Sequence, residues 1–297
     1  MPIAHLLLAL LVAIIWGVNF LFVKLALDEI SPLFLCALRF LLASVPAIFL
    51  IKPPAIPFRL VALYGLIMFA LQFALLFIGM NAGMTPGMAS LIIQVQVFFS
   101  MFFAAVLLGE QPSLWQVGGA LVSFIGIGLV AMHVDKNISL LGFMFILAAA
   151  ATWGLGNLIT KKIKDINMMA LVIWGSFVAF VPMLILALVV EGQDKLVYSY
   201  QHLTGLGLSS LFYIVYISTW VGYGVWNWLL SRYAIGAIVP FTLLVPVVGI
   251  LSSVLILGEP FQLWKLTAGL VVITGLCINV LSTRFRMVKV PQELARN

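Results

Sequence analysis

The sequence predicts an all-α integral membrane protein with ten transmembrane helices arranged as two inverted five-helix repeats. The first observation behind this prediction is composition, because hydrophobic residues make up 64% of the 297 residues, charged residues make up 8%, and the mean hydropathy is +1.24. The second is a series of apolar stretches, and the third is a similarity between the two halves of the chain. A soluble protein of this length could not hide so much apolar surface from water.

Apolar stretches of membrane-spanning length fill almost the whole chain. A helix needs about 20 apolar residues to cross the hydrocarbon core, and irregular backbone cannot face lipid. The longest connection covers 191–203 and leaves little room for a soluble domain. The ten predicted spans are 6–26, 32–51, 60–80, 86–108, 114–133, 139–160, 170–190, 204–228, 235–257 and 263–283.

Spans 1 and 6 each carry a tryptophan followed by an asparagine. Asn19 follows Trp16 by three residues and Asn157 follows Trp153 by four, spacings that put each pair on one helix face. An amide offers donors and an acceptor, which suits a zwitterionic substrate like an amino acid. The alternative is hydrogen bonding between helices, worth about 0.6 kcal/mol on average. All four are candidate substrate-binding residues.

Span 2 contains Arg39, the only full charge well within a predicted span. Placing it there costs roughly 2.5–3.5 kcal/mol on insertion scales, so it needs a carbonyl or carboxylate partner. We favour a structural anchor. The alternative is that its guanidinium holds a substrate carboxylate, which it fits bidentately.

Spans 3 and 4 supply three glutamines as further candidates. Gln72 lies in the middle of span 3, and Gln94 and Gln96 lie in span 4. Residues two apart point roughly 200° away from each other around a helix. We therefore expect one of the pair to line a site and the other to bridge to a neighbouring helix. Ser90, one turn before Gln94, favours Gln94 for the lining.

Span 8 carries an aromatic and polar stripe at helical spacing. Its members repeat at steps of three and four, which indicates one helix face. Tyr216 and Trp220 are too near the middle of the span for an interfacial aromatic belt. The stripe is therefore predicted to line a cavity, with helix packing as the alternative. It comprises Tyr213, Tyr216, Trp220, Tyr223 and Asn227.

Spans 9, 5 and 10 suggest moving and scaffolding parts. Pro246 is expected in the middle of span 9, where it would loosen backbone bonding and permit bending, so it is a candidate gate residue. Spans 5 and 10 are rich in glycine, which allows close helix contact. We expect them to act as a scaffold or as a homodimer surface. Their glycines include Gly118, Gly119, Gly126, Gly269 and Gly275.

The distribution of basic residues predicts both termini in the cytoplasm. With that orientation the opposite side carries only Lys24, Lys136, Lys195 and Lys265. The cytoplasmic segments carry Lys52, Arg59, Lys161, Lys162, Lys164, Arg232, Arg284, Arg286, Lys289 and Arg296.

The chain divides into similar halves, 1–136 and 137–297. Trp16-Gly17 matches Trp153-Gly154 at an offset of 137, and Leu108-Gly109-Glu110 matches Leu257-Gly258-Glu259 at an offset of 149, which also aligns Tyr64 with Tyr213. Five spans per half is an odd number, so the second half must enter from the opposite side. Inverted repeats of this kind build transporters with a site at the midplane between the halves. The alternative is two halves that only stabilise each other.

These motifs resemble the EamA branch of the drug/metabolite transporter superfamily over essentially the full length. The similarity rests on Trp16-Gly17-Val18-Asn19-Phe20, Leu38-Arg39-Phe40, Leu107-Leu108-Gly109-Glu110, Trp153-Gly154, Pro246 and Leu257-Gly258-Glu259-Pro260. Gln94-Val95-Gln96 and Gly156-Asn157 are most similar to the bacterial exporters of O-acetylserine and cysteine. Many members carry proline where this chain has Val97. The resemblance implies alternating access in a bacterial inner membrane and export of small amino-acid metabolites.

Other functions fit the sequence less well. It has no GxxxxGK[ST] loop, no Cys/His cluster and only scattered basic residues, so we predict no cofactor, no metal and no nucleic acid. No Asp or Glu lies in mid-membrane, so no proton relay is visible, and facilitated export or exchange is at least as consistent. A lipid-acting enzyme or a channel would need clustered catalytic groups or charged rings. An exporter of aromatic amino acids or drug-like compounds remains the main competitor. Apart from the small-molecule substrate, membrane lipid is the expected partner.

Overall fold

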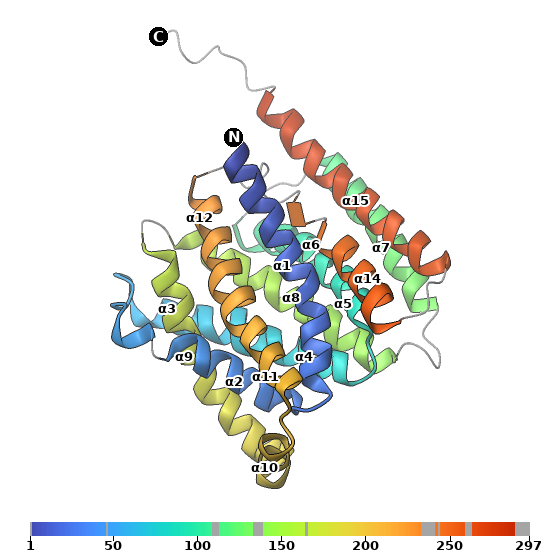
Figure 1. Cartoon of the computed structure of the whole chain (residues 1–297). Helices are drawn as coiled ribbons and strands as arrows, with labels where there is room; N and C mark the ends of the chain where they lie inside the picture. Colours follow the sequence, from blue (N-terminus) through green and yellow to red (C-terminus); the bar gives the residue numbers. More distant parts are fainter. Residues whose placement is uncertain are drawn as a thin grey trace.

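The computed structural model shows a bundle of helices that cross one another in several directions (Figure 1). It describes residues 2–45, 47–108, 113–132, 139–163, 166–232, 241–242, 244–258 and 263–288. The α-helices are α1 (Ile3–Leu27), α2 (Pro32–Ser44), α3 (Phe58–Tyr64), α4 (Gln72–Asn81), α5 (Pro86–Ile92), α6 (Gln96–Leu108), α7 (Leu114–Met132), α8 (Leu140–Lys162), α9 (Met168–Leu186), α10 (Gln193–Gln201), α11 (Gly205–Phe212), α12 (Gly224–Arg232), α14 (Leu244–Leu257) and α15 (Leu263–Val288). Short 3₁₀ turns form η1 (Ala47–Phe49) and η3 (Ile93–Val95), and π-helical turns form η2 (Gly65–Leu71), η4 (Ala187–Glu191) and η5 (Tyr213–Tyr223).

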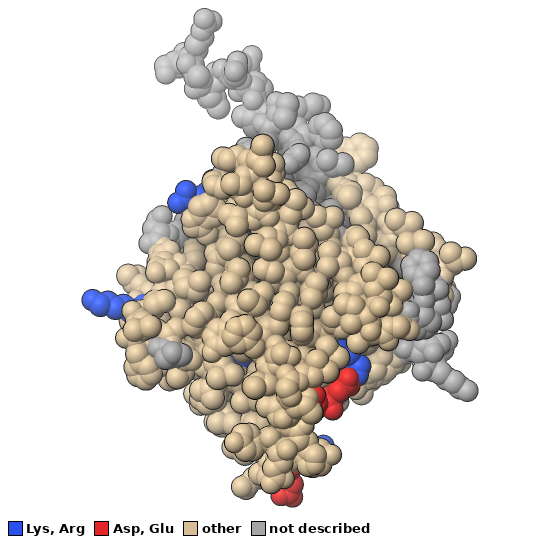
Figure 2. All heavy atoms as spheres, in the orientation of Figure 1, with Lys and Arg blue, Asp and Glu red and all other residues tan. Residues whose placement is uncertain are grey.

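The described helices confirm the predicted all-α membrane class. Seven apolar helical segments are long enough to cross a bilayer, and three shorter apolar helices follow the same order along the chain as predicted spans 5, 9 and 10. On the face shown in Figure 2, the charged side chains lie almost entirely at the margins, and the broad middle is uncharged. The seven long segments are Ile3–Leu27, Pro32–Phe49, Phe58–Asn81, Pro86–Leu107, Leu140–Thr160, Met168–Glu191 and Gly205–Trp226, and the shorter ones are Val117–Gly126, Leu244–Leu257 and Leu266–Gly275.

The predicted second span, 32–51, is interrupted. Its helix α2 ends at Ser44, and Val45 is extended with φ −98° and ψ 129°. Position 46 is a proline, which drives the residue before it out of the helical region. The segment therefore reaches η1 through a break that apolar content alone does not reveal.

The predicted connection over 191–203 is also more ordered than expected, because most of it forms α10. Gly192 precedes this helix with a φ of 85°, a conformation that glycine adopts without steric cost. The chain thus turns sharply after η4 and runs as a helix along the end of the bundle that is lowest in Figure 1.

Pro246 lies in α14, whose first described residue is Leu244. Residues 235–240 and 243, which precede it in predicted span 9, lie outside the described part of the chain. That Pro246 permits bending in the middle of span 9 therefore stays a prediction.

Three of the described spans are wound as π-helix over part of their length. η2 lies between α3 and α4, η4 follows α9, and η5 lies between α11 and α12. Bonds in a π-helix join residues five apart, and within η5 the hydroxyl of Thr219 likewise donates to the backbone oxygen of Ile214 at 2.9 Å. This winding changes which residues of the span share a face.

The helices pair across the two halves of the chain. α1 packs on α14 and on the α11–η5–α12 segment, α8 packs on α6 and α4, and α2 packs on α9. α7 and α15 lie side by side at one edge of the bundle (Figure 1). A Cβ at Gly126 would collide with Val272, and one at Gly275 would collide with Ser123. The absence of side chains at these two glycines therefore allows α7 and α15 to touch.

Candidate functional site

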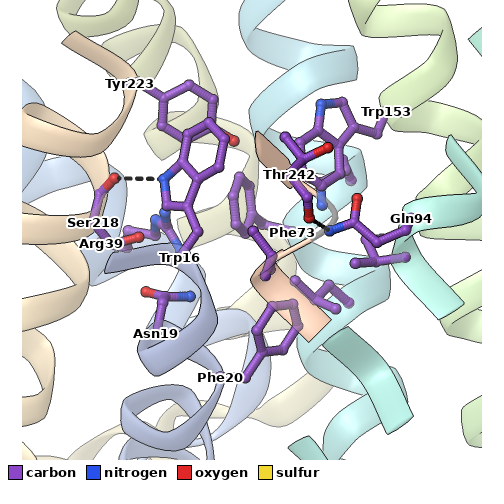
Figure 3. Close-up of a pocket in the computed structure, with 14 residues that line it drawn as sticks. Trp16, Asn19, Phe20, Arg39, Phe73, Gln94, Trp153, Ser218, Tyr223 and Thr242 are labelled. Atoms are coloured by element: carbon purple, nitrogen blue, oxygen red, sulfur yellow. Dashed lines mark hydrogen bonds between the residues drawn. The ribbon is translucent and has the colours of Figure 1, made fainter. Parts of the chain in front are cut away.

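A small cavity lies among helices from both halves of the chain (Figure 3). The cavity volume is about 40 Å³, which is room for roughly three waters. The cavity as described is therefore smaller than an amino acid requires. Its lining consists of Trp16, Asn19, Phe20, Arg39, Gln72, Phe73, Leu76, Ile93, Gln94, Trp153, Ser218, Tyr223, Thr242 and Val245.

The polar side chains of this cavity are buried but incompletely bonded. Four atoms of the lining have no hydrogen-bond partner within the described protein: Asn19 Oδ1, Arg39 Nη1, Gln72 Oε1 and Gln94 Oε1. All four residues are at most 6% exposed. Among the described residues, only two hydroxyls elsewhere share this condition. Buried polar groups are nearly always hydrogen-bonded. These four atoms could therefore form hydrogen bonds with a ligand or water in the cavity.

Arg39 enters the cavity from α2. Its Nε donates to the hydroxyl of Thr219 at 3.1 Å, and its guanidinium carbon lies 3.9 Å from the centre of the Phe73 ring. The hydroxyl and the ring favour the cation but carry no formal negative charge to neutralise it. The side chain is thus held in place while Nη1 stays unpartnered.

Aromatic side chains form the apolar walls. The indole nitrogen of Trp16 donates to the backbone oxygen of Ser218 at 3.2 Å, and its ring lies 6.4 Å from that of Trp153 and 5.2 Å from that of Tyr223. Gly222 permits this approach, because a Cβ there would collide with the Trp16 indole. The two tryptophans that the sequence repeat aligns therefore contact each other at the cavity.

The structure separates the two glutamines of span 4. Gln94 lines the cavity and donates from Nε2 to the backbone oxygen of Thr242 at 3.0 Å. Gln96 instead accepts from Asn157 Nδ2 at 2.7 Å and from the hydroxyl of Ser100 at 3.4 Å. Gln94 lies within the 3₁₀ turn η3 and Gln96 begins α6, and their side chains have different partners, as the two-residue spacing predicted. Gln96 and Asn157 lie outside the lining, in a bond between α6 and α8.

The predicted aromatic stripe of span 8 does not line the cavity as one face. Tyr213 donates to the backbone oxygen of Ile15 at 3.0 Å, and Trp220 donates to that of Ala43 at 2.8 Å. Tyr216 packs edge-on against Trp220 with ring centres 5.1 Å apart. Of the stripe only Tyr223 reaches the lining, and the side chain of Asn227 lies outside the described part.

The π-helical winding explains this difference. The stripe assumed the spacing of an α-helix, whereas η5 covers Tyr213–Tyr223 as π-helix. Residues five apart, such as Ser218 and Tyr223, then fall on one face, and both line the cavity. A search of the sequence for polar or aromatic residues five positions apart would have found this pair, but no sequence pattern indicated that this segment is a π-helix.

The lining combines amides, hydroxyls, aromatic rings and one cation. It contains no Asp, Glu, His or Cys, and no three such residues gather anywhere among the described residues to hold a metal ion. Acid–base and nucleophilic catalysis depend on such groups or an activated hydroxyl. What this set of groups can do is bind a small polar molecule between aromatic walls.

Comparisons with known proteins agree with this description. The profile of the EamA-like transporter family matches residues 3–132 and again 140–281. A protein of Escherichia coli K12 named "Probable amino-acid metabolite efflux pump" is 38% identical over 286 residues, covering 94% of this chain and 95% of the relative. Its namesake in Salmonella typhimurium is 39% identical over the same coverage. One crystal structure, 14% identical, superposes with a TM-score of 0.69 over 97% of this chain and all of the other, which extends the likeness to the fold.

Proposed function

Because the chain belongs to the EamA-like transporter family, we propose that it exports small amino-acid metabolites of the O-acetylserine and cysteine kind. The family and its efflux-pump relatives make it a multi-pass membrane exporter and not an enzyme. The finer proposal concerns the substrate and the route by which the substrate crosses the membrane.

The observation that carries the proposal is the set of unpartnered polar atoms in the central cavity. Three amide oxygens and one guanidinium nitrogen are buried there without a bond. Such atoms cost free energy unless a ligand or water satisfies them. We assign substrate contact to Trp16, Asn19, Arg39, Gln72, Gln94 and Trp153, and a structural role to Gln96, Asn157, Tyr213, Tyr216 and Trp220.

The route we propose is alternating access between two inverted repeats, 1–136 and 137–297. Three observations support it: the family profile matches each half once, α1–α14 and α8–α6 pack in corresponding ways, and π-helical turns occur in the third span of each half. A site between such repeats can open to either face in turn. The narrow cavity would then widen as one face opens. On this proposal the protein lies in a bacterial inner membrane with both termini in the cytoplasm. Pro246 is proposed as a gate residue and not as a substrate contact.

A second candidate is export of aromatic amino acids or drug-like compounds. The rings of Trp16, Phe20, Phe73, Trp153 and Tyr223 favour it, because five of the lining side chains are aromatic. Aromatic walls bind flat ligands as well as small apolar ones.

Uptake into proteoliposomes of purified protein tests both candidates. Radiolabelled cysteine, O-acetylserine and tryptophan are supplied separately, each with and without a proton gradient. We expect saturable uptake of the first two, weakened about 10-fold or more by Asn19→Ala or Gln94→Ala, while Gln96→Ala keeps the wild-type KM. Uptake of tryptophan alone would replace the first candidate with the second. Gradient dependence distinguishes coupled transport from facilitated export.

A further inference from the structure

The positive charge of Arg39 in the cavity indicates which chemical groups a substrate should carry. Arg39 is 1% exposed, and its described partners are a hydroxyl and aromatic rings. Every Asp and Glu of the sequence lies outside the ten predicted spans. No lining residue can therefore neutralise the guanidinium, and a buried cation without a counter-ion is costly.

The lining also carries acceptors, and in Figure 3 Gln94 lies across from Arg39 whereas Asn19 lies on the side of Trp16. The orientation of the Gln94 amide is fixed, because its Nε2 must donate to the backbone oxygen of Thr242, which can only accept. Gln94 Oε1, on this lining residue, is then left without a donor. Asn19 and Gln72 add two further amides with unpartnered oxygens.

We propose that the cavity selects α-amino acids by holding the carboxylate on Arg39 and the ammonium group on the amide oxygens. This inference rests on the proposed function and specifies its substrate class. The guanidinium fork matches a carboxylate, and an ammonium group has three protons to donate. The substrate supplies the missing counter-ion, so an amine that lacks a carboxylate would leave Arg39 uncompensated. Small apolar side chains would face Trp16 and Trp153.

Matched analogues test this in the wild-type protein. Cysteine and cysteamine differ only by the carboxylate, as do tryptophan and tryptamine. The pair that matches the solute class actually transported is used as competitors against the labelled amino acid. We expect the amine to compete about 10- to 100-fold more weakly than the amino acid, the loss typical of a charged hydrogen-bonded pair. Equal competition would overturn the inference, while the identity of the transported solute separately decides the proposed function.

Variants of Arg39 give a second readout that a structural role would not move. Arg39→Gln should bring the competition of amino acid and amine close to a ratio of one, whereas Arg39→Lys should keep most of the preference. If Arg39→Gln fails to fold, the wild-type competition still decides. A folded Arg39→Gln protein that retains the wild-type preference would contradict a contact between Arg39 and the carboxylate.

A different observation carries a second inference, at the end of the bundle where α10 lies. The carboxylate of Glu191, at the end of η4, accepts from the N-terminal end of α2. Its Oε2 accepts from the hydroxyl of Ser31 at 2.6 Å and from the amide of Phe34 at 3.1 Å, and its Oε1 accepts from the amide of Leu33 at 2.8 Å. A carboxylate at this position caps the helix and complements its dipole.

Glu29 makes the reverse connection. It follows α1, and its carboxylate accepts from the amide of Thr204 at 2.8 Å and from its hydroxyl at 2.6 Å, just before α11 begins. Gly207 in the first turn of α11 leaves room for this carboxylate, since a Cβ would collide with it. Each half of the chain thus supplies a carboxylate that holds a helix start of the other half.

We infer that Glu29 and Glu191 form an interlock that keeps this face of the transporter closed and must release when the face opens. Rocking of the halves would separate both carboxylates from their donors. The inference rests on the proposed alternating access. Glu29→Gln with Glu191→Gln should therefore change the transport rate without changing the competition between amino acid and amine.

A reversible cross-link tests the interlock directly. The amide of Ser31 lies 3.4 Å from the hydroxyl of Ser199, so Ser31→Cys with Ser199→Cys should form a disulfide in a protein that also carries Cys36→Ala and Cys277→Ala. We expect oxidation to abolish uptake of the solute that the wild type carries and reductant to return it to its level before oxidation, with Ser199→Cys alone unaffected by either treatment. Full uptake by the cross-linked protein would overturn the interlock while leaving the substrate proposal intact.

Discussion

The interlock and the cavity treat polar groups in opposite ways. At the interlock both oxygens of Glu191 and both oxygens of Glu29 have donors. In the cavity Asn19, Arg39, Gln72 and Gln94 each keep an unpartnered atom although they are more deeply buried. A group that the chain satisfies contributes to the fold, whereas one that it leaves unsatisfied costs stability until a ligand arrives. On our proposal, this difference distinguishes the carboxylates that hold the fold from the cavity residues that contact the substrate.

The largest effect is expected from a substitution that gives Arg39 a counter-ion within the protein. Gln94→Glu places a carboxylate opposite Arg39, across a narrow space. The new internal pair would compete with the substrate carboxylate, and we expect uptake to fall by about 100-fold, equivalent to roughly 2.7 kcal/mol. Thermal unfolding followed by tryptophan fluorescence measures how far the new ion pair offsets the lost bond from Gln94 Nε2 to the backbone oxygen of Thr242. Normal uptake by this variant would mean that Arg39 does not contact the substrate.

Removing a carboxylate from the interlock should lower the stability of the protein and leave substrate binding unchanged. Glu191→Ala leaves two backbone amides and a hydroxyl at the start of α2 without their acceptor. We expect the free energy of unfolding to fall by about 2 kcal/mol, as for the loss of a strong helix cap. The KM of the folded protein should stay at the wild-type value. A changed KM with unchanged stability would assign Glu191 to substrate binding.

The sequence predicted the spans better than it predicted their interior geometry. Lipid requires about 20 apolar residues per crossing, and that demand is visible in the composition of each stretch. The direction of Gln94 away from Gln96 followed from the two-residue spacing. The roles of Glu29 and Glu191 could not be read in this way, because their partners are 175 and about 160 residues away in the chain. Such caps depend on how helices meet.

Span 8 is a second region where the sequence predicted the span but not the directions of its side chains. The aromatic stripe was derived from the period of an α-helix, and the π-helical winding of η5 moves Tyr213 and Trp220 away from the cavity. A π-helix is rare and occurs mostly as a bulge inside an α-helix, so a pattern read with the α-helical period does not predict it. Arg39 was expected to find a carbonyl or carboxylate partner, and within the described residues it finds Thr219 and Phe73 instead.

The two glutamines of span 4 offer a matched pair for a smaller effect. Gln96→Leu removes the acceptor of Asn157 Nδ2 at 2.7 Å, and we expect stability to fall by about 1 kcal/mol with KM unchanged. Gln94→Leu removes the bond from its Nε2 to the backbone oxygen of Thr242 at 3.0 Å, so a similar loss of stability is expected, but here KM should also rise about 10-fold. Unfolding midpoints and uptake kinetics on the same preparations check both. Exchanged results would reverse the assignment of the pair.

The smallest expected effect tests the corrected interpretation of span 8. Tyr213→Phe removes the hydroxyl that donates to the backbone oxygen of Ile15 at 3.0 Å but keeps the ring stacked on Phe22. We expect the free energy of unfolding to fall by about 0.5–1 kcal/mol, with KM within about twofold of the wild type because Tyr213 lies outside the lining. Tyr223→Phe is the matched control, since Tyr223 lines the cavity. If Tyr213→Phe changed KM more than Tyr223→Phe did, the substrate would follow the predicted stripe, and the face defined by the π-helix would not be the binding face.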